Sequence, residues 1–184
     1  IAGALALSEA RSAGVGRDSA VLLRGTSLSD PRLMPCGNRP AAVLIDLDEA
    51  SPFPSARQRA AQPGLAQGLA RLRASGIAVL WLSNRHVSES AATALLLRGS
   101  GLDPAGEDRF FFPRAPAERK QTRRLDAAGE FCILAQAGDK RGDFDELFDY
   151  LRQPSAARAL EPMFGTAWFE APAPLTYTPT NQED

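Results

Sequence analysis

Acidic side chains that directly follow apolar runs are the residues best placed to do chemistry in this sequence. Asp46 and Asp48 follow the apolar run 41–45, and Asp139 and Asp143 follow another. On an extended chain, side chains two residues apart point the same way, so Asp46 and Asp48 can face one ligand. Proteins hold magnesium, a hard cation, with one or two carboxylates together with waters and phosphate oxygens. The acidic residues therefore predict a magnesium site.

A hydroxyl and a lysine are predicted to join these carboxylates. Ser83 and Asn84 follow the apolar run 77–82, and Lys120 is one of only two lysines in the chain. A metal ion, a lysine and O–H or N–H donors together offset the charge of a phosphate dianion, so that a carboxylate can attack phosphorus. An aspartate nucleophile would form an acyl phosphate that water then hydrolyses. This set of groups predicts phosphoryl transfer.

Taken alone, each of these features also has a purely structural interpretation. The Asp-x-Asp at 46–48 suits a turn or a helix cap. Asp139 and Asp143 suit the first turn of a helix, where the helix dipole favours acids. Lys120 suits a solvated face of a basic helix that also carries Arg119, Arg123 and Arg124. The order of the features along the chain is what favours the phosphate site.

The elements that position these groups are predicted from apolar runs and from glycine and proline breaks. The predicted strands are 42–45, 77–82, 110–112, 131–135 and 168–169. The predicted helices are one or two within 2–23, one between Gly64 and Gly76, and others at 88–98, 117–128 and 144–151. Strands that alternate with helices, without hairpin signals, predict an α/β fold with a parallel sheet and helices on both faces. Ligands of such folds bind beyond the carboxyl ends of the strands.

Composition bounds the possible functions. The 184 residues suit one domain, and 21 basic against 22 acidic residues give no strong nucleic-acid footprint. No apolar run approaches the roughly 20 residues that span a membrane. The single histidine, His86, excludes a multi-histidine metal site, and we favour a loop or capping role for it. Cys36 and Cys132 fit no zinc spacing, and we favour two free, partly buried thiols over a disulfide.

Four stretches, in order, resemble the motifs of the haloacid dehalogenase (HAD) superfamily of phosphatases, and most closely those of class B and class C acid phosphatases. They are the Asp-x-Asp motif in 42–49, the Ser-Asn-Arg motif in 82–85, the lysine motif in 119–124 and the Gly-Asp motif in 138–144; the stretch 165–169 also resembles the family's closing strand. The resemblance implies a Rossmann-like core at 40–171. We expect an N-terminal helical segment, 1–39, to pack on this core, and an extended tail at 172–184.

The resemblance also implies a role for each motif residue. Asp46 would be the nucleophile and a metal ligand. Asp48 would be the general acid/base and would bind the metal through its backbone carbonyl. Ser83, Asn84 and Lys120 would bind the phosphate, and Asp139 would bind the metal. Asp143 would act through a water molecule, or it would orient Lys120.

Three features depart from the family pattern. Ala50 stands where the family has threonine, and Lys140 stands where it has asparagine beside the metal ligand. The stretch between Asp48 and Pro63 is too short for a folded cap domain. A single domain with a reduced or absent cap follows, with an open site that admits bulky phosphate esters.

The sequence therefore predicts a magnesium-dependent phosphomonoesterase that acts through an aspartyl-phosphate on a small or open-access phosphate ester. Ala50, Lys140 and the short cover favour one alternative, a degenerate fold that binds a phosphorylated ligand or protein without turnover. A second alternative is action on nucleic-acid end phosphates. A homodimer is compatible with the sequence. The chain begins at Ile1 rather than Met, which we interpret as a trimmed product, and the resemblance implies a periplasmic or secreted protein.

Overall fold

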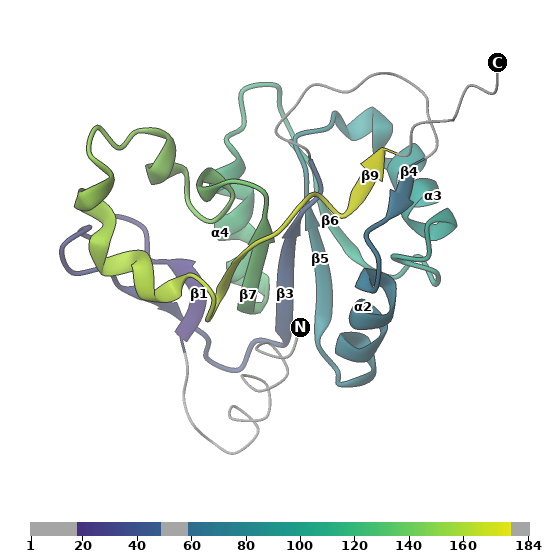
Figure 1. Ribbon diagram of the computed structural model, residues 1–184, viewed down its shortest axis with the longest axis horizontal. Helices are drawn as coiled ribbons and strands as arrows, with labels where there is room; N and C mark the ends of the chain where they lie inside the picture. Colours follow the sequence, from purple (N-terminus) through teal and green to yellow (C-terminus); the bar gives the residue numbers. More distant parts are fainter. Residues whose placement is uncertain (1–17, 49–58, 178–184) are drawn as a thin grey trace.

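A computed structural model describes residues 18–48 and 59–177, and a five-stranded parallel sheet forms its centre (Figure 1). The strand order is β6-β5-β3-β7-β8, and each neighbouring pair is parallel. The strands are β3 (Ala41–Asp46), β5 (Ala78–Leu82), β6 (Arg109–Phe111), β7 (Cys132–Gly138) and β8 (Trp168–Glu170). The predicted parallel sheet and its strands are confirmed.

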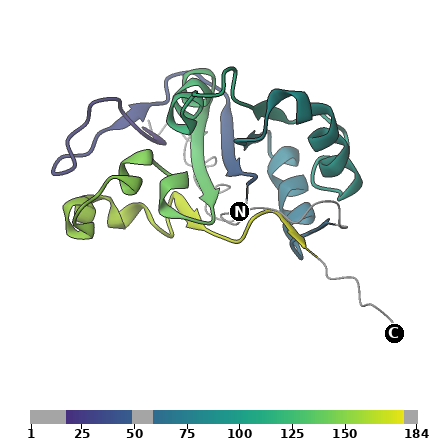
Figure 2. The same ribbon diagram turned by 90° about the horizontal axis from the view of Figure 1, so that it is seen from above.

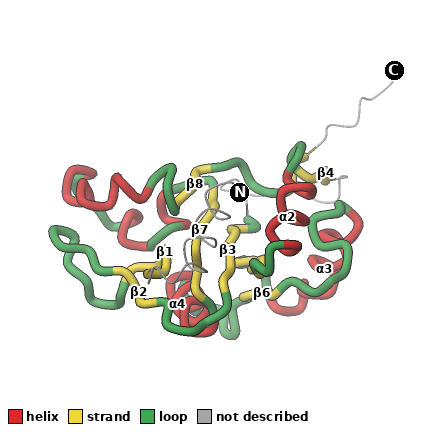
Figure 3. The backbone as a smooth tube through the Cα atoms, turned by 90° about the horizontal axis from the view of Figure 1, so that it is seen from below, coloured by secondary structure: helices red, strands yellow, loops and turns green. Residues whose placement is uncertain are grey.

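Helices cover both faces of this sheet (Figures 2 and 3). On one face lie α2 (Leu65–Ala74) and α3 (Ser90–Gly99), whose buried leucines pack against Val43 and Ile45 of β3. On the other face lies α4 (Lys120–Glu130), whose buried alanines share a core with Ala42 and Leu44. Because β3 is covered on both sides, its sequence from Ala41 to Ile45 is apolar instead of alternating. The predicted α/β class is confirmed.

The smaller elements surround this core. Two antiparallel pairs are β1 (Asp18–Leu22) with β2 (Leu33–Pro35), and β4 (Arg59–Ala61) with β9 (Leu175–Tyr177). Four 3-10 helices in the described part of the chain are η1 (Val87–Glu89), η2 (Arg141–Asp143), η3 (Glu146–Asp149) and η4 (Pro154–Met163). His86 caps η1 by accepting from the backbone N–H of Ser88, which confirms its predicted capping role.

The predicted helix over 2–23 is wrong for its last part, because residues 18–22 form the strand β1. Tertiary hydrogen bonds hold this strand against the sheet. The carbonyl of Ala20 accepts from Gln136 Nε2 and from Trp168 Nε1, each at 2.7 Å, and Ser19 Oγ donates to the carbonyl of Ile133. These partners are more than a hundred residues away, so local helix propensity could not anticipate them. Residues 1–17 lie outside the described part.

One further prediction needs correction. The predicted helix at 144–151 is only the short 3-10 helix η3, where Asp145 caps the backbone N–H of Leu147. Of the tail predicted to be extended or loose, Leu175–Tyr177 form the extended strand β9, which pairs with β4. Residues 178–184 lie outside the described part, and so do residues 49–58, which include Ala50 and most of the shortened cover.

Cys36 and Cys132 form a disulfide, so the expectation of two free thiols is wrong. Their Cα atoms are 4.8 Å apart, within the range that a disulfide requires. The pairing follows from the sheet, since Cys132 begins β7 and donates its backbone N–H to the carbonyl of Pro40, directly before β3. The bond therefore joins the segment between β2 and β3 to the start of β7. Sequence spacing could not reveal a contact across 96 residues.

Within residues 18–48 and 59–177, no helix combines the length and the apolar character needed to cross a membrane.

Candidate active site

The polar motif residues lie at the carboxyl edge of the sheet. β3 ends at Asp46, which is in register with Leu82 at the end of β5, and Ser83 follows directly. On the other side of β3, Ile45 is in register with Ala137, one residue before the end of β7. Parallel strands end at the same edge, so the residues after each strand converge there. The sheet register thus brings together segments up to 93 positions apart, from Asp46 to Asp139.

Three carboxylates cluster at this edge. One oxygen from each of Asp46, Asp139 and Asp143 lies within 4.8 Å of the others. Asp46 and Asp143 are buried, and Asp139 is partly buried. Acidic groups this close repel one another unless a cation or a proton lies among them.

Lys120 supplies part of the positive charge that this cluster needs. It begins α4, and its Nζ lies 2.5 Å from Asp46 Oδ1 and 3.0 Å from Asp143 Oδ1. The two neighbouring carboxylates raise the pKa of Lys120 although its burial opposes ionisation. Lys120 is therefore a cation at neutral pH. It lies between Asp46, the expected nucleophile, and Asp143, which is expected to orient Lys120.

One ammonium group does not balance three carboxylates. Burial raises the pKa of Asp46 to about 7, and Asp143 adds to the rise while Lys120 opposes it. Burial also disfavours the ionised Asp143, but Lys120, the hydrogen bond with Asp46 and the backbone N–H of Lys140 together lower its pKa. Below about pH 7 and without a further cation, the raised pKa of Asp46 favours a proton on this carboxyl, whereas the lowered pKa of Asp143 favours its ionised form. A divalent cation among three oxygen donors would replace that proton, so the residues present fit a hard metal ion.

Asp143 is held in this position by the backbone of the Gly-Asp motif. Its Oδ2 accepts the N–H groups of Asp139 and Lys140, both at 3.1 Å. A side chain at Gly138 would collide with Asp143, which explains the glycine before the metal-ligand candidate. Lys140, which departs from the family pattern, is exposed. Its backbone therefore orders the site while its side chain faces solvent.

Asp48 is not part of the carboxylate cluster. Ser83 Oγ donates to Asp48 Oδ1 at 2.8 Å, and the backbone N–H of Asn84 makes a short contact with Oδ2. Arg85 Nε lies 3.6 Å from the same carboxylate. The donors that the sequence assigned to a phosphoryl group thus hold an anion already, the carboxylate of Asp48. Of Asn84, only the backbone faces this position, because its side-chain Oδ1 accepts from Arg123 at 2.5 Å.

The sequence analysis missed two residues of this region, Arg123 and Arg124, and counted them with a solvated helix face. Both side chains are buried, while Arg119 is largely exposed. The helical period carried the signal: Lys120, Arg123 and Arg124 lie on the face that also carries Ala127 and Ala128. The small apolar residues one helical turn after Arg123 and Arg124 indicate that this face of α4 is buried. Basic residues on a buried face need buried partners.

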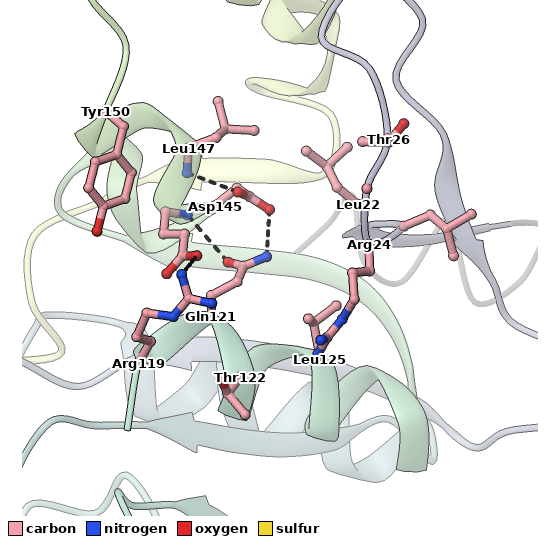
Figure 4. A pocket seen from close by; sticks show the side chains of 13 residues that line it. Leu22, Arg24, Thr26, Arg119, Gln121, Thr122, Leu125, Asp145, Leu147 and Tyr150 are labelled. Atoms are coloured by element: carbon pink, nitrogen blue, oxygen red, sulfur yellow. Dashed lines mark hydrogen bonds and ion pairs between the residues drawn. The ribbon is translucent and has the colours of Figure 1, made fainter. Parts of the chain in front are cut away.

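A separate surface pocket of about 350 Å³ is lined by residues of α4, of β1 with the loop after it, and of the segment around η3 (Figure 4). Its wall is a polar network in which Gln121 donates to Asp145 Oδ2 at 2.7 Å and Arg119 pairs with Glu146. Neither the carboxylate cluster nor Ser83 or Lys120 lines it. The pocket does not coincide with the candidate active site.

No family model matches the sequence, and no curated protein matches it either. Among solved structures, the fold is similar to the class C acid phosphatase from Bacillus anthracis, with a TM-score of 0.57 and 18% identity over 75% of this chain and 69% of that one. It is also similar to the same enzyme with tungstate bound, with a TM-score of 0.56, 17% identity and the same coverage. The chain therefore has the α/β fold of class C acid phosphatases.

Proposed function

We propose that this chain, which has the fold of class C acid phosphatases, is a magnesium-dependent phosphomonoesterase that acts through an aspartyl-phosphate on Asp46. The observation that carries the proposal is the position of the Asp46 carboxylate. It lies at the end of the central strand, in contact with Lys120 and within reach of Asp139 and Asp143. A buried carboxylate beside a lysine and a metal-type cluster can serve as a nucleophile toward phosphorus.

Asp46 and Asp139 would hold the metal ion through their carboxylates, together with the backbone carbonyl of Asp48. Asp143 would remain beside them, holding Lys120 at 3.0 Å. A bound magnesium ion would stabilise the charge that develops on the phosphoryl oxygens. Burial raises the pKa of Asp46, and a protonated carboxyl is a poor nucleophile. A cation bound beside Asp46 would lower this pKa and ionise the carboxyl, which supports the assignment of Asp46 as a metal ligand.

Substrate binding would displace the carboxylate of Asp48. Ser83 Oγ and the N–H of Asn84 hold that carboxylate now, and the same donors would bind the phosphoryl oxygens. Rotation about the side-chain bonds of Asp48 would then move its carboxyl toward the ester oxygen that leaves. Lys120 would contact both the nucleophile and the phosphoryl group, which brings two anions together without prohibitive repulsion.

The reaction would proceed in two displacements. One Asp46 oxygen would form a bond to phosphorus as the ester P–O bond breaks. Asp48, after taking up a proton from solvent on leaving Ser83 and Asn84, would donate this proton to the leaving alcohol. Asp48, now ionised, would then remove a proton from a water molecule whose oxygen attacks the same phosphorus. The acyl-phosphate bond would break, releasing inorganic phosphate and restoring both the Asp46 carboxylate and the protonated Asp48.

The test measures phosphate released from an aryl phosphate by the wild type and by Asp46→Asn, each with magnesium and with a chelator. We expect turnover only for the wild type with magnesium. Equal rates for the two proteins would refute the role of Asp46 as nucleophile. A panel of mononucleotides, sugar phosphates and 3′-phosphorylated oligonucleotides then identifies the class of ester.

One observation favours a second candidate, a protein that binds a phosphorylated ligand without turnover. The carboxylate of Asp48 already fills the donors of Ser83 and Asn84, so the general acid/base is engaged where the ligand would bind. This candidate predicts phosphate binding with no hydrolysis of any ester in the panel. Turnover of a single ester that depends on Asp46 would exclude it.

A further inference from the structure

Two adjacent arginines of α4 are buried, and their guanidinium groups reach opposite sides of the site. The side chains of Arg123 and Arg124 are almost inaccessible to solvent, and the residues are neighbours in the sequence. Neither residue belongs to the carboxylate cluster or donates to Asp48. Instead, Arg123 donates hydrogen bonds to the loop after β5, and Arg124 donates to the loop after β7.

Arg123 holds the loop after β5. Its Nη2 donates to the carbonyl of Ser83 at 3.2 Å and to Asn84 Oδ1 at 2.5 Å, and its Nη1 donates to the carbonyl of Glu118. The contact with Ser83 is buried. These bonds fix the backbone at Ser83 and Asn84. The Oγ of Ser83 and the backbone N–H of Asn84 face the position that the Asp48 carboxylate now fills.

Arg124 holds the loop after β7. Its Nη2 donates to the carbonyls of Gly142 and Asp143, at 3.2 and 2.7 Å, and its Nη1 makes a short contact with Gln121 Oε1. The segment that it fixes carries Asp143, which in turn accepts from the backbone of Asp139. The carboxylate cluster therefore depends on this arginine although the guanidinium does not enter it.

The arrangement is costly for the fold. A buried guanidinium loses its hydration, and the Nε atoms of both arginines have no hydrogen-bond partner among the described residues. Replacing a whole buried ion pair with apolar side chains is often neutral or stabilising, but removing one partner alone is destabilising. The partners of these arginines include backbone carbonyls of the two site loops, so each arginine contributes to the geometry of the loop that it binds.

We propose that Arg123 and Arg124 are positioning residues with separate tasks: Arg123 sets the phosphate-binding loop and Arg124 sets the metal-binding side. The inference rests on the proposed function. Because one helix also supplies Lys120, α4 would align the ends of β3, β5 and β7 through three successive basic contacts. The two arginines differ in the loop that they hold, so each variant serves as the matched control for the other.

The experiment compares Arg123→Met and Arg124→Met with the wild type, in the full chain. It measures magnesium affinity by calorimetry without substrate, the inhibition constant of inorganic phosphate, and KM and kcat for an aryl phosphate. We expect Arg123→Met to weaken phosphate binding and raise KM on the order of tenfold, with magnesium affinity unchanged. We expect Arg124→Met to weaken magnesium binding on the order of tenfold, with phosphate affinity at saturating magnesium unchanged.

The sign of the magnesium effect separates positioning from simple charge. Removal of a cation near three carboxylates would by itself strengthen magnesium binding, whereas loss of the loop geometry weakens it. Tighter or equal binding in Arg124→Met would therefore overturn the inference. Equal changes in both variants for both ligands would overturn it as well.

Two further variants keep the test decisive if a methionine variant does not fold. Asn84→Ala removes an acceptor of Arg123 without changing any charge, and it should raise KM in the same direction. Arg124→Lys should recover part of the magnesium affinity, and no recovery in a folded protein would count against the proposal. If the wild type hydrolyses no ester, the proposed function fails, but magnesium and phosphate titrations of the same proteins still test the two arginines.

Discussion

The disulfide between Cys36 and Cys132 is expected to supply a large share of the stability of this fold. A cross-link stabilises a protein mainly because it restricts the unfolded chain, and the effect grows with the loop that it closes. The two cysteines are 96 residues apart. A loop of this size corresponds to about 4.7 kcal/mol at 25 °C in the chain-entropy relation. That is a large fraction of the roughly 5–15 kcal/mol that stabilises a typical domain.

The assay is equilibrium unfolding in urea, with the wild type measured under oxidising conditions and after reduction. The double variant Cys36→Ala/Cys132→Ala is the covalent control, because alanine leaves no unpaired polar group in the buried position. We expect reduction and the double substitution to lower the free energy of unfolding by similar amounts, up to about 4.7 kcal/mol. Reduction should leave the double variant unchanged.

A loss below about 1 kcal/mol in both cases would refute the reasoning, because the bond would then not restrict the unfolded chain as the loop size requires. The native site should be little affected. The bond links the segment before β3 to the start of β7, whereas Asp46 ends β3 and Asp139 follows the end of β7. Magnesium affinity of the folded, reduced protein should therefore equal that of the oxidised protein.

Three other outcomes follow from the carboxylate cluster. Lys120→Met should lower kcat/KM by about 100-fold or more and shift the acidic limb of the pH–rate profile upward, because Asp46 loses the cation that lowers its pKa. In thermal unfolding, magnesium at 100 times its dissociation constant should stabilise the wild type by about 2.7 kcal/mol, and Asp139→Asn should lose most of this gain. For the metal-free protein, the folded state keeps a proton on Asp46 up to about pH 7, whereas the unfolded chain releases it near 3.8. The contribution of Asp46 to stability should therefore fall as pH rises between these values, and comparison of wild type with Asp46→Asn in chelator isolates it.

Local patterns were sufficient to predict the positions of the sheet strands. Residues 41–45 of β3 and all residues of β5 are apolar because both faces of these strands are covered, and such apolar runs are visible in a short window of the sequence. β1 could not be predicted in this way. Its residues suit a helix locally, and the strand is favoured by its pairing with β2 and by hydrogen bonds from Gln136 and Trp168 to Ala20.

Some features of the site were likewise predicted from the sequence, and others were not. Asp46, Lys120, Asp139 and Asp143 were identified from type and spacing, and the structure places them together. The position of Asp48 was not predictable, because its carboxylate turns toward Ser83 and Asn84 instead of the cluster. The arginines of α4 were misread because a basic run usually indicates a solvated face.

The sequence by itself determined which groups are available for chemistry: paired acids after an apolar strand, a hydroxyl after the next, a rare lysine and a Gly-Asp turn. Their identity is a local property, written in residue type and spacing. The tertiary structure decided which of them touch. The disulfide, the choice of Asp48 between two partners and the loops that Arg123 and Arg124 bind all depend on contacts between distant segments. Such contacts form only when sheet register and helix packing fix the distances, and no pattern within a single segment encodes those distances.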